Sequence, residues 1–291
     1  MKAIRLYLIL WSALLTGACA EDKQLGDVEP LEQGYVLPQG KSPADDRIVS
    51  LFDKYGTYFL YEYTEADFSW RQGGGSLIYS YTAPDPLYAG NMLDLLDEIW
   101  FRFYPEEFHK KYMPRKVFLA GTLESGSGTI YARVAQGQIA VGCCSSVLVD
   151  MPGEMKQAFK SELQRVLLRD WITRGIITIP DEFYAVSDYS YEADTDNPDS
   201  PDYARARGFV AMSNGAEWCG RVDWQTGMLP ESEDLRYFID SMVSRTAEEW
   251  ASDLEYPLVQ QKYDILREYI LENYKIDLRE IGNKTIENKK D

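Results

Sequence analysis

The chain has 291 residues, of which 45% are hydrophobic, so it contains enough apolar material for one large domain with a buried core. Its formal net charge of −17 argues against nucleic acid and anionic lipid as partners, because a negative surface repels phosphate groups. The only histidine is His109, so no metal site that requires two imidazole ligands can form within the chain. We expect His109 to be a surface or boundary residue, because no nucleophile motif accompanies it.

The N-terminal residues are typical of a bacterial lipoprotein signal. Two basic residues precede an apolar run, residues 6–15, that is too short to span a bilayer. The segment ends in "LTGAC", which resembles a lipobox, although Thr16 stands where leucine is usual. We therefore expect residues 1–18 to be a signal peptide and Cys19 to carry the lipid that anchors the mature protein in a membrane. The acidic pair that follows resembles a surface-export signal, so we expect an outer-membrane lipoprotein exposed at the cell surface.

The rest of the chain divides into a tether and one folded domain. Residues 19–41 lack hydrophobic periodicity and contain Gly, Pro and acidic residues, so they are predicted to form a flexible tether. The domain is predicted to span residues 42–285, with an α/β half at 42–150 and a mostly helical half at 151–285. The expected fold class is α+β, with a mixed sheet in the first half.

The α/β half alternates helical patterns with short runs of aromatic and β-branched residues. A helix is predicted from residue 42 to Gly56, and a second in "NMLDLLDEIWFRFYP". Strands are predicted in "TYFLYEYT", "SLIYSYT", "RKVFLAG", "TIYARVA" and "QIAVGCC". The last two are separated by Gln136-Gly137 at the predicted turn between them.

The helical half opens with "GEMKQAFKSELQRVLLRDW", residues 153–171. Apolar residues at helical spacing form one face of this helix, and Lys156, Lys160 and Gln164 are predicted to mark its solvent side. After an acidic loop at 181–207, two further helices are predicted in "SEDLRYFIDSMVSRTAEEWASDL" and "PLVQQKYDILREYILENYK".

The middle of the 153–171 helix reads "SELQR", which would become the zinc-protease signature H-E-x-x-H with histidine at both ends. Ser161 and Arg165 stand at those ends, and Glu162 alone matches the signature. Residues four apart share one side of a helix, so these side chains are predicted to lie together on a line beside the core.

These segments, in this order, resemble the substrate-import-associated zinc metallohydrolase lipoproteins, a zincin-like metallopeptidase family found with outer-membrane nutrient importers. The resemblance covers most of the mature chain. It rests on "DKYGTYFLYEY", "YMPRKVFLAG", "FKSELQRV", "IPDEFYAVSDYSY", "RGFVAM" and "KYDILREYILENYKIDLREI". It implies a zincin-like fold and an importer complex as partner. It also implies an edge strand at which an extended peptide pairs, for which the candidate is "TIYARVAQGQIAVG".

The resemblance also implies a zinc site, from which this sequence departs. Ser161 and Arg165 occupy the two histidine positions, and Glu162 occupies the position of the base that acts on metal-bound water, here vestigial. Glu217, in "NGAEWCGRV", corresponds to the third ligand and is expected to line the same cleft. One glutamate cannot replace two imidazoles, so we predict no catalytic zinc, no cofactor and a pseudo-metallopeptidase.

Arg165 is predicted to substitute for the charge of the metal by donating hydrogen bonds to Glu162 and Glu217. A buried pair of this kind would make Arg165→Ala strongly destabilising. The alternative is an ordinary ion pair between Arg165 and Glu162 on the helix surface.

Two further patterns leave alternatives open. One disulfide can join Cys219 to either Cys143 or Cys144, which leaves one thiol over. The alternative is that all three cysteines remain free, buried thiols. Aspartates near residues 194–199 loosely resemble calcium spacing, but the loop lacks the usual glycine, and a solvated acidic loop is preferred.

The sequence predicts a surface accessory protein that binds peptide or glycan near an importer. The competing hypotheses are an active hydrolase, either a metallopeptidase or a metal-free enzyme with Glu162 and Glu217 as a carboxylate pair, and a purely structural lipoprotein.

Overall fold

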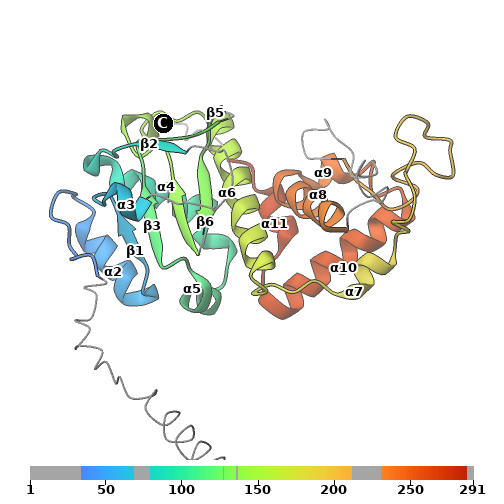
Figure 1. Ribbon diagram of the computed structural model, residues 1–291, viewed down its shortest axis with the longest axis horizontal. Coiled ribbons are helices and arrows are strands. Elements are labelled where there is room, and N and C mark those ends of the chain that lie inside the picture. The colour runs from blue at the N-terminus through green and yellow to red at the C-terminus, as the bar shows by residue number, and fades with distance from the viewer. Residues whose placement is uncertain (1–33, 69–78, 127, 136, 212–230, 287–291) are drawn as a thin grey trace, which may run out of the picture. The chain divides into compact units, whose positions relative to one another are not determined.

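The computed structural model describes residues 34–68, 79–126, 128–135, 137–211 and 231–286 (Figure 1). The strands are β1 (Tyr58–Leu60), β2 (Ser80–Thr82), β3 (Lys116–Leu119), β4 (Thr122–Ser125), β5 (Gly128–Thr129), β6 (Ala132–Ala135) and β7 (Gln138–Val141). The helices are α2 (Asp45–Tyr55), α3 (Glu65–Phe68), α4 (Ala89–Ile99), α5 (Glu106–Tyr112), α6 (Gly153–Thr173), α7 (Asp181–Ala185), α8 (Glu231–Ser244), α9 (Ala247–Trp250), α10 (Pro257–Tyr274) and α11 (Leu278–Asn283). Short 3-10 turns lie at Pro86–Tyr88, Phe101–Phe103 and Ser146–Leu148. None of the helices in this part of the chain is long and apolar enough to cross a membrane.

A mixed four-stranded sheet forms the centre of the first half, in the order β1-β3-β7-β6. The strands β1, β3 and β7 are parallel, and β6 returns antiparallel to β7. The inner strands β3 and β7 are almost continuously apolar, as is typical of parallel strands that are covered on both faces. A second sheet, in the order β2-β4-β5, continues from the end of β3 and is largely exposed. Since the described strands all precede residue 142 and helices follow, the predicted α+β class is confirmed.

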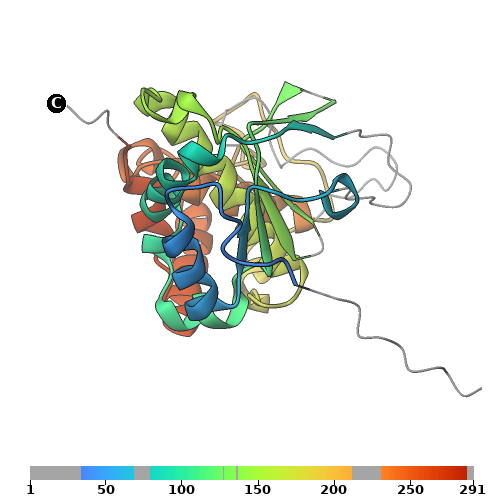
Figure 2. The same cartoon turned by 90° about the vertical axis from the view of Figure 1, so that its left-hand side faces the viewer.

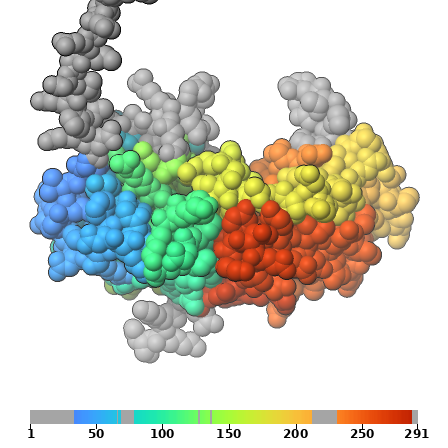
Figure 3. Space-filling view, turned by 90° about the horizontal axis from the view of Figure 1, so that it is seen from below, coloured from blue at the N-terminus to red at the C-terminus, as the bar shows by residue number. Residues whose placement is uncertain are grey.

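Helices α2, α4 and α6 lie on one side of the four-stranded sheet (Figure 2). Arg47 of α2 forms ion pairs with Asp94 and Asp97 of α4, and these charges fix the first two helices side by side. Helix α6 packs against β6 on one side and α8 on the other, so it lies between the two halves of the domain (Figure 1). Figure 3 shows the C-terminal helices, in red, directly against the first half.

The predicted solvent side of α6 is wrong at two of its three positions. Lys160 is completely buried, and its ammonium donates to the carbonyl oxygens of Ile281 at 2.6 Å and Lys284 at 2.7 Å, at the end of α11. Burial lowers the pKa of Lys160 to about 8. Gln164 is also buried and donates to the carbonyl oxygen of Ile99 at 2.6 Å. Hydrophobic periodicity missed both residues because it treats a long polar side chain as exposed, even where the backbone of another element supplies its partners.

The C-terminal helices close over α6. Gly282 of α11 approaches α8 so closely that an added Cβ would lie 2.4 Å from the carbonyl oxygens of Met242 and Arg245. Only a residue without a side chain fits there, so this glycine sets how α11 docks on α8. The Lys160 contacts lie at the same helix end, and they satisfy carbonyl groups that the helix itself leaves unpaired.

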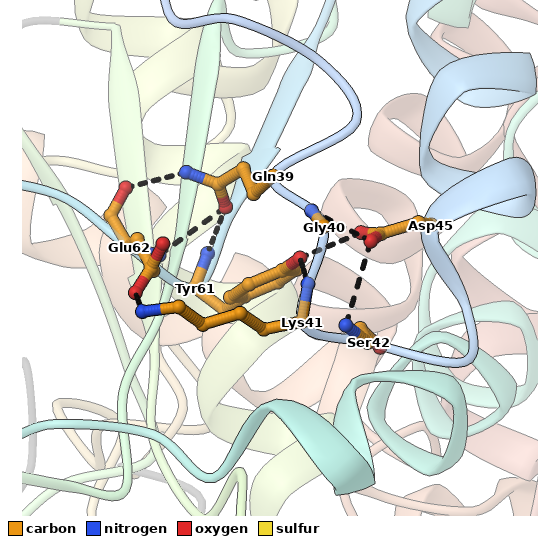
Figure 4. A network of polar contacts seen from close by, with 7 residues as sticks. All are labelled: Gln39, Gly40, Lys41, Ser42, Asp45, Tyr61 and Glu62. Carbon is orange, nitrogen blue, oxygen red and sulfur yellow. Dashed lines mark hydrogen bonds and ion pairs between the residues drawn. The ribbon is translucent and has the colours of Figure 1, made fainter.

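The segment before α2 is hydrogen-bonded to the end of β1 (Figure 4). The side-chain amide of Gln39 donates to the carbonyl oxygen of Glu62 at 2.6 Å and accepts from the backbone N–H of Tyr61 at 3.0 Å, as a neighbouring strand would. The Tyr61 hydroxyl accepts from the Lys41 N–H and donates to Asp45 at 2.7 Å. Gln39 and Lys41, assigned to the tether by sequence, are therefore bound to the domain.

Candidate functional site

The residues of the "SELQR" pentapeptide lie on the accessible side of α6. Ser161, Glu162, Arg165 and Arg169 are half-buried and Ala158 is exposed, whereas the intervening residues 163, 164, 167 and 168 are buried. With 3.6 residues per turn these five positions form one strip along the helix, which we call the outer strip. The predicted grouping of Ser161, Glu162 and Arg165 is therefore present, and it faces outward from the packed core.

Glu162 is held by the backbone of the neighbouring strand. Its Oε1 atom accepts hydrogen bonds from the N–H groups of Tyr131 at 2.8 Å and Ala132 at 3.1 Å. One turn earlier on α6, the ring of Phe159 stacks on the ring of Tyr131 at 5.1 Å. The carboxylate thus connects α6 to the start of β6. No sequence pattern signals this contact, because its donors are backbone groups.

Among the described strands, β6 lies at the edge of its sheet, and some of its peptide groups face away from that sheet. The Gly142 N–H donates to the Tyr131 carbonyl oxygen, and from there the ladder alternates, so Arg133 and Ala135 bond toward β7. The peptide groups of Ala132 and Val134 consequently face the free edge. Glu162 takes the N–H of Ala132, which leaves the Val134 N–H and C=O as the next outward pair.

Helix α6 runs parallel to β6, so the position of Arg165 along the strand can be derived from two contacts. Phe159 lies beside Tyr131 at one end, and the guanidinium of Arg174 lies 3.2 Å from where a Cβ of Gly137 would be at the other. Helical and strand rises of about 1.5 and 3.3 Å per residue place Arg165 level with residues 133–134. Arg165 is also one turn from Glu162 on the outer strip, so its backbone lies level with Val134 along β6.

The predicted ion pair between Arg165 and Glu162 is not formed. Within the described ranges, the guanidinium of Arg165 has neither a hydrogen bond nor an ion pair, although burial lowers its pKa and the charge of Glu162 opposes that shift. The predicted second acceptor, Glu217, lies outside the described residues. Since Arg165 is half-buried and unpaired with Glu162, the large loss of stability expected for Arg165→Ala no longer follows.

At the far end of the outer strip, the charge of Arg169 is neutralised by a carboxylate of α8. Arg169 donates to both carboxylate oxygens of Asp240, at 2.9 Å from Nε to Oδ1, and Asp240 is buried. Arg236, one turn before Asp240, pairs with Glu233. The arginines at this end thus have carboxylate partners, in contrast to Arg165.

The two described cysteines of the first half are not equivalent. Cys144 is buried, and burial raises the pKa of its thiol to about 12. Cys143 is half-buried with a positive φ of 69°, and burial together with the charge of Glu162 raises its pKa. Both are free thiols, and Cys219 lies outside the described residues. In the described part of the chain, no three His, Cys, Asp or Glu side chains are arranged to hold a metal ion, in the acidic loop at 194–199 or elsewhere.

The Glu162 contacts lead to a stability prediction. Glu162→Ala should lower the free energy of unfolding by about 1–3 kcal/mol, because the N–H groups of Tyr131 and Ala132 lose their acceptor. Glu162→Gln keeps an acceptor oxygen and should retain most of the stability. Urea denaturation of the two variants measures the difference. Equal losses for alanine and glutamine would show that the charge, and not the acceptor, matters.

A family model and a solved structure are similar to this chain. A family model described as "Putative zinc-binding metallo-peptidase" matches residues 52–279. A crystal structure of the same description, from Bacteroides caccae ATCC 43185, has 14% sequence identity and a TM-score of 0.47, covering 81% of this chain and 90% of that chain. No curated protein matches the chain. Since the family model spans well over half of the sequence, the chain belongs to the family of that description.

Proposed function

We propose that this family member is a lipid-anchored surface protein that holds no catalytic zinc and binds extended peptide as an accessory to a nutrient importer. The observation that carries the proposal is the donor set on the outer strip of α6. Ser161 and Arg165 stand at the histidine positions, and the carboxylate of Glu162 is engaged by two backbone N–H groups.

These residues do not fit a zinc ion. A catalytic zinc takes three protein ligands, which in this signature include both histidines of the helix. A neutral serine hydroxyl is a poor zinc ligand compared with an imidazole. A guanidinium carries a positive charge and has no free lone pair for a metal. The single histidine, His109, is buried in another part of the fold, where its Nε2 atom lies 2.9 Å from the carbonyl oxygen of Phe101.

Metal analysis of the purified protein tests this proposal. After incubation with zinc and removal of the excess, wild type should retain far less than one zinc per chain by mass spectrometry of the metal. The double variant Ser161→His with Arg165→His restores both imidazoles and should retain more zinc than wild type. One tightly bound zinc in wild-type protein would overturn the proposal.

The proposed ligand is peptide in preference to glycan because of the edge of β6. A strand with outward N–H and C=O groups can add an extended chain through main-chain hydrogen bonds. Val134 presents both groups beside the outer strip of α6. The lipid anchor at Cys19 and the importer partner rest on the signal-like N-terminus and on the resemblance to importer-associated lipoproteins.

An active hydrolase is the competing function. The zinc measurement tests the metallopeptidase form of that hypothesis, which requires a bound zinc in wild-type protein. An activity screen on the metal-free protein tests the carboxylate-pair form, which requires that wild type hydrolyses a substrate and that Glu162→Gln does not.

A further inference from the structure

One charged side chain on the outer strip has no role in the packing described above. Arg165 lies on the accessible side of α6, half-buried, and within the described residues it has neither an ion pair nor a hydrogen bond. The neighbouring arginines contact carboxylates: Arg169 of α6 pairs with Asp240, and Arg174, just after the helix, pairs with Asp170. A guanidinium that is partly removed from water and has no acceptor is costly, which favours an anionic ligand from outside the domain.

The surroundings of Arg165 restrict the chemistry of this ligand. Glu162 lies one turn away and the chain has a net charge of −17, so a dianionic or polyanionic ligand is repelled more strongly than a single carboxylate. The planar fork of an arginine also matches the two oxygens of a carboxylate. The outward N–H and C=O of Val134 lie at the same height along α6 and are suited to a peptide backbone.

We propose that Arg165 binds the C-terminal carboxylate of an extended peptide that pairs with the outward peptide groups of Val134. The inference rests on the proposed peptide-binding function and adds its substrate class, which is peptides with a free C-terminus. It makes the edge of β6 the site for the last residues of the ligand. The charge of Arg165 then serves recognition in place of the catalysis expected at this helix position.

The test compares two libraries of N-acetylated random pentapeptides that are identical except at the C-terminus, one as free acids and one as amides. Each is passed over the immobilised full-length mature protein, and retained peptides are quantified by mass spectrometry. Free acids should bind about 10- to 100-fold more tightly than amides, as expected for a hydrogen-bonded charge. Arg165→Gln should abolish this preference and Arg165→Lys should keep part of it. Arg174→Gln, at an exposed arginine just after the same helix, should leave it unchanged.

The outcomes separate this inference from the function on which it rests. Equal retention of acids and amides, both lost in Val134→Pro, would overturn the role of Arg165 and leave peptide binding at β6 intact. The proline removes an N–H that the sheet does not use, and thermal melting verifies that the variant folds. If neither library is retained by wild type, both the inference and the peptide-binding function are wrong.

Discussion

Asp234→Asn is expected to lower the free energy of unfolding by about 3–5 kcal/mol, because it removes the charge that compensates a fully buried lysine. The carboxylate of Asp234 on α8 contacts the ammonium of Lys262 on α10 at 2.6 Å, and both side chains are completely shielded from solvent. Asparagine has nearly the same shape, so the loss measures the removed charge and not a cavity. Denaturation in urea at neutral pH measures it.

The surroundings of this pair explain why the effect should be large. The hydroxyl of Tyr189 donates to Asp234 at 2.6 Å, and Lys262 lies within 5.0 Å of the ring centroids of Phe183 and Phe209. Aromatic faces stabilise a cation but cannot neutralise it.

Two comparisons isolate the buried charge. Arg236→Gln disrupts a half-buried pair on the same helix and should cost much less, about 1 kcal/mol or under. Replacing both partners, Asp234→Leu with Lys262→Met, should recover much of the loss, since an apolar pair leaves no charge to compensate. The idea is wrong if the double variant loses as much stability as the sum of the losses of Asp234→Leu and Lys262→Met measured singly.

Stability should fall below pH 6.5 because of one residue, His109. The side chain is 3% exposed and packs against Tyr55, Tyr104 and Phe101, so the expectation of a surface or boundary position is wrong. Burial lowers the pKa of His109 from 6.5, with Lys54 acting in the same direction and the Phe101 carbonyl and Glu106 opposing. The pocket favours the neutral form of the imidazole, whose Nε2 atom lies 2.9 Å from the Phe101 carbonyl oxygen. Sequence patterns do not reveal this protonation state.

The sign follows from proton linkage. The unfolded chain binds the His109 proton more tightly than the folded one, so the contribution is complete above pH 6.5 and decreases as the pH falls toward the lower folded pKa. In that window the slope approaches about 1.4 kcal/mol per pH unit for one proton. Wild type and His109→Gln, melted in urea at a series of pH values, should differ by this slope. Since the chain has one histidine, parallel curves for the two proteins would refute the assignment.

The sequence predicted those parts of the fold that depend on apolar periodicity. The expected apolar faces of the last long helices are present, with Ile239 and Met242 of α8 and Leu266 and Ile270 of α10 buried. Gly56 ends α2 in the left-handed conformation, as a C-terminal glycine should. Strand β4 was missed because Thr122–Ser125 carries polar residues and lies in the small exposed sheet.

The candidate site was only partly predictable. The spacing of Ser161, Glu162 and Arg165 correctly placed them on one side of a helix, because helical geometry is local. The partner of Glu162 could not be predicted, since the N–H groups of Tyr131 and Ala132 reach it only through the packing of α6 on β6. The burial of Lys160 likewise depends on α11, 121 residues later in the chain.

The division of α6 into a packed inner side and an accessible outer strip bears on how such a protein evolves. The inner residues, among them Lys160 and Gln164, hold the domain together, whereas positions 161 and 165 have little part in that packing. Substitutions away from buried features typically change stability by no more than about 0.5 kcal/mol. The side chains at positions 161 and 165 can therefore be exchanged for residues of different chemistry while the domain still folds.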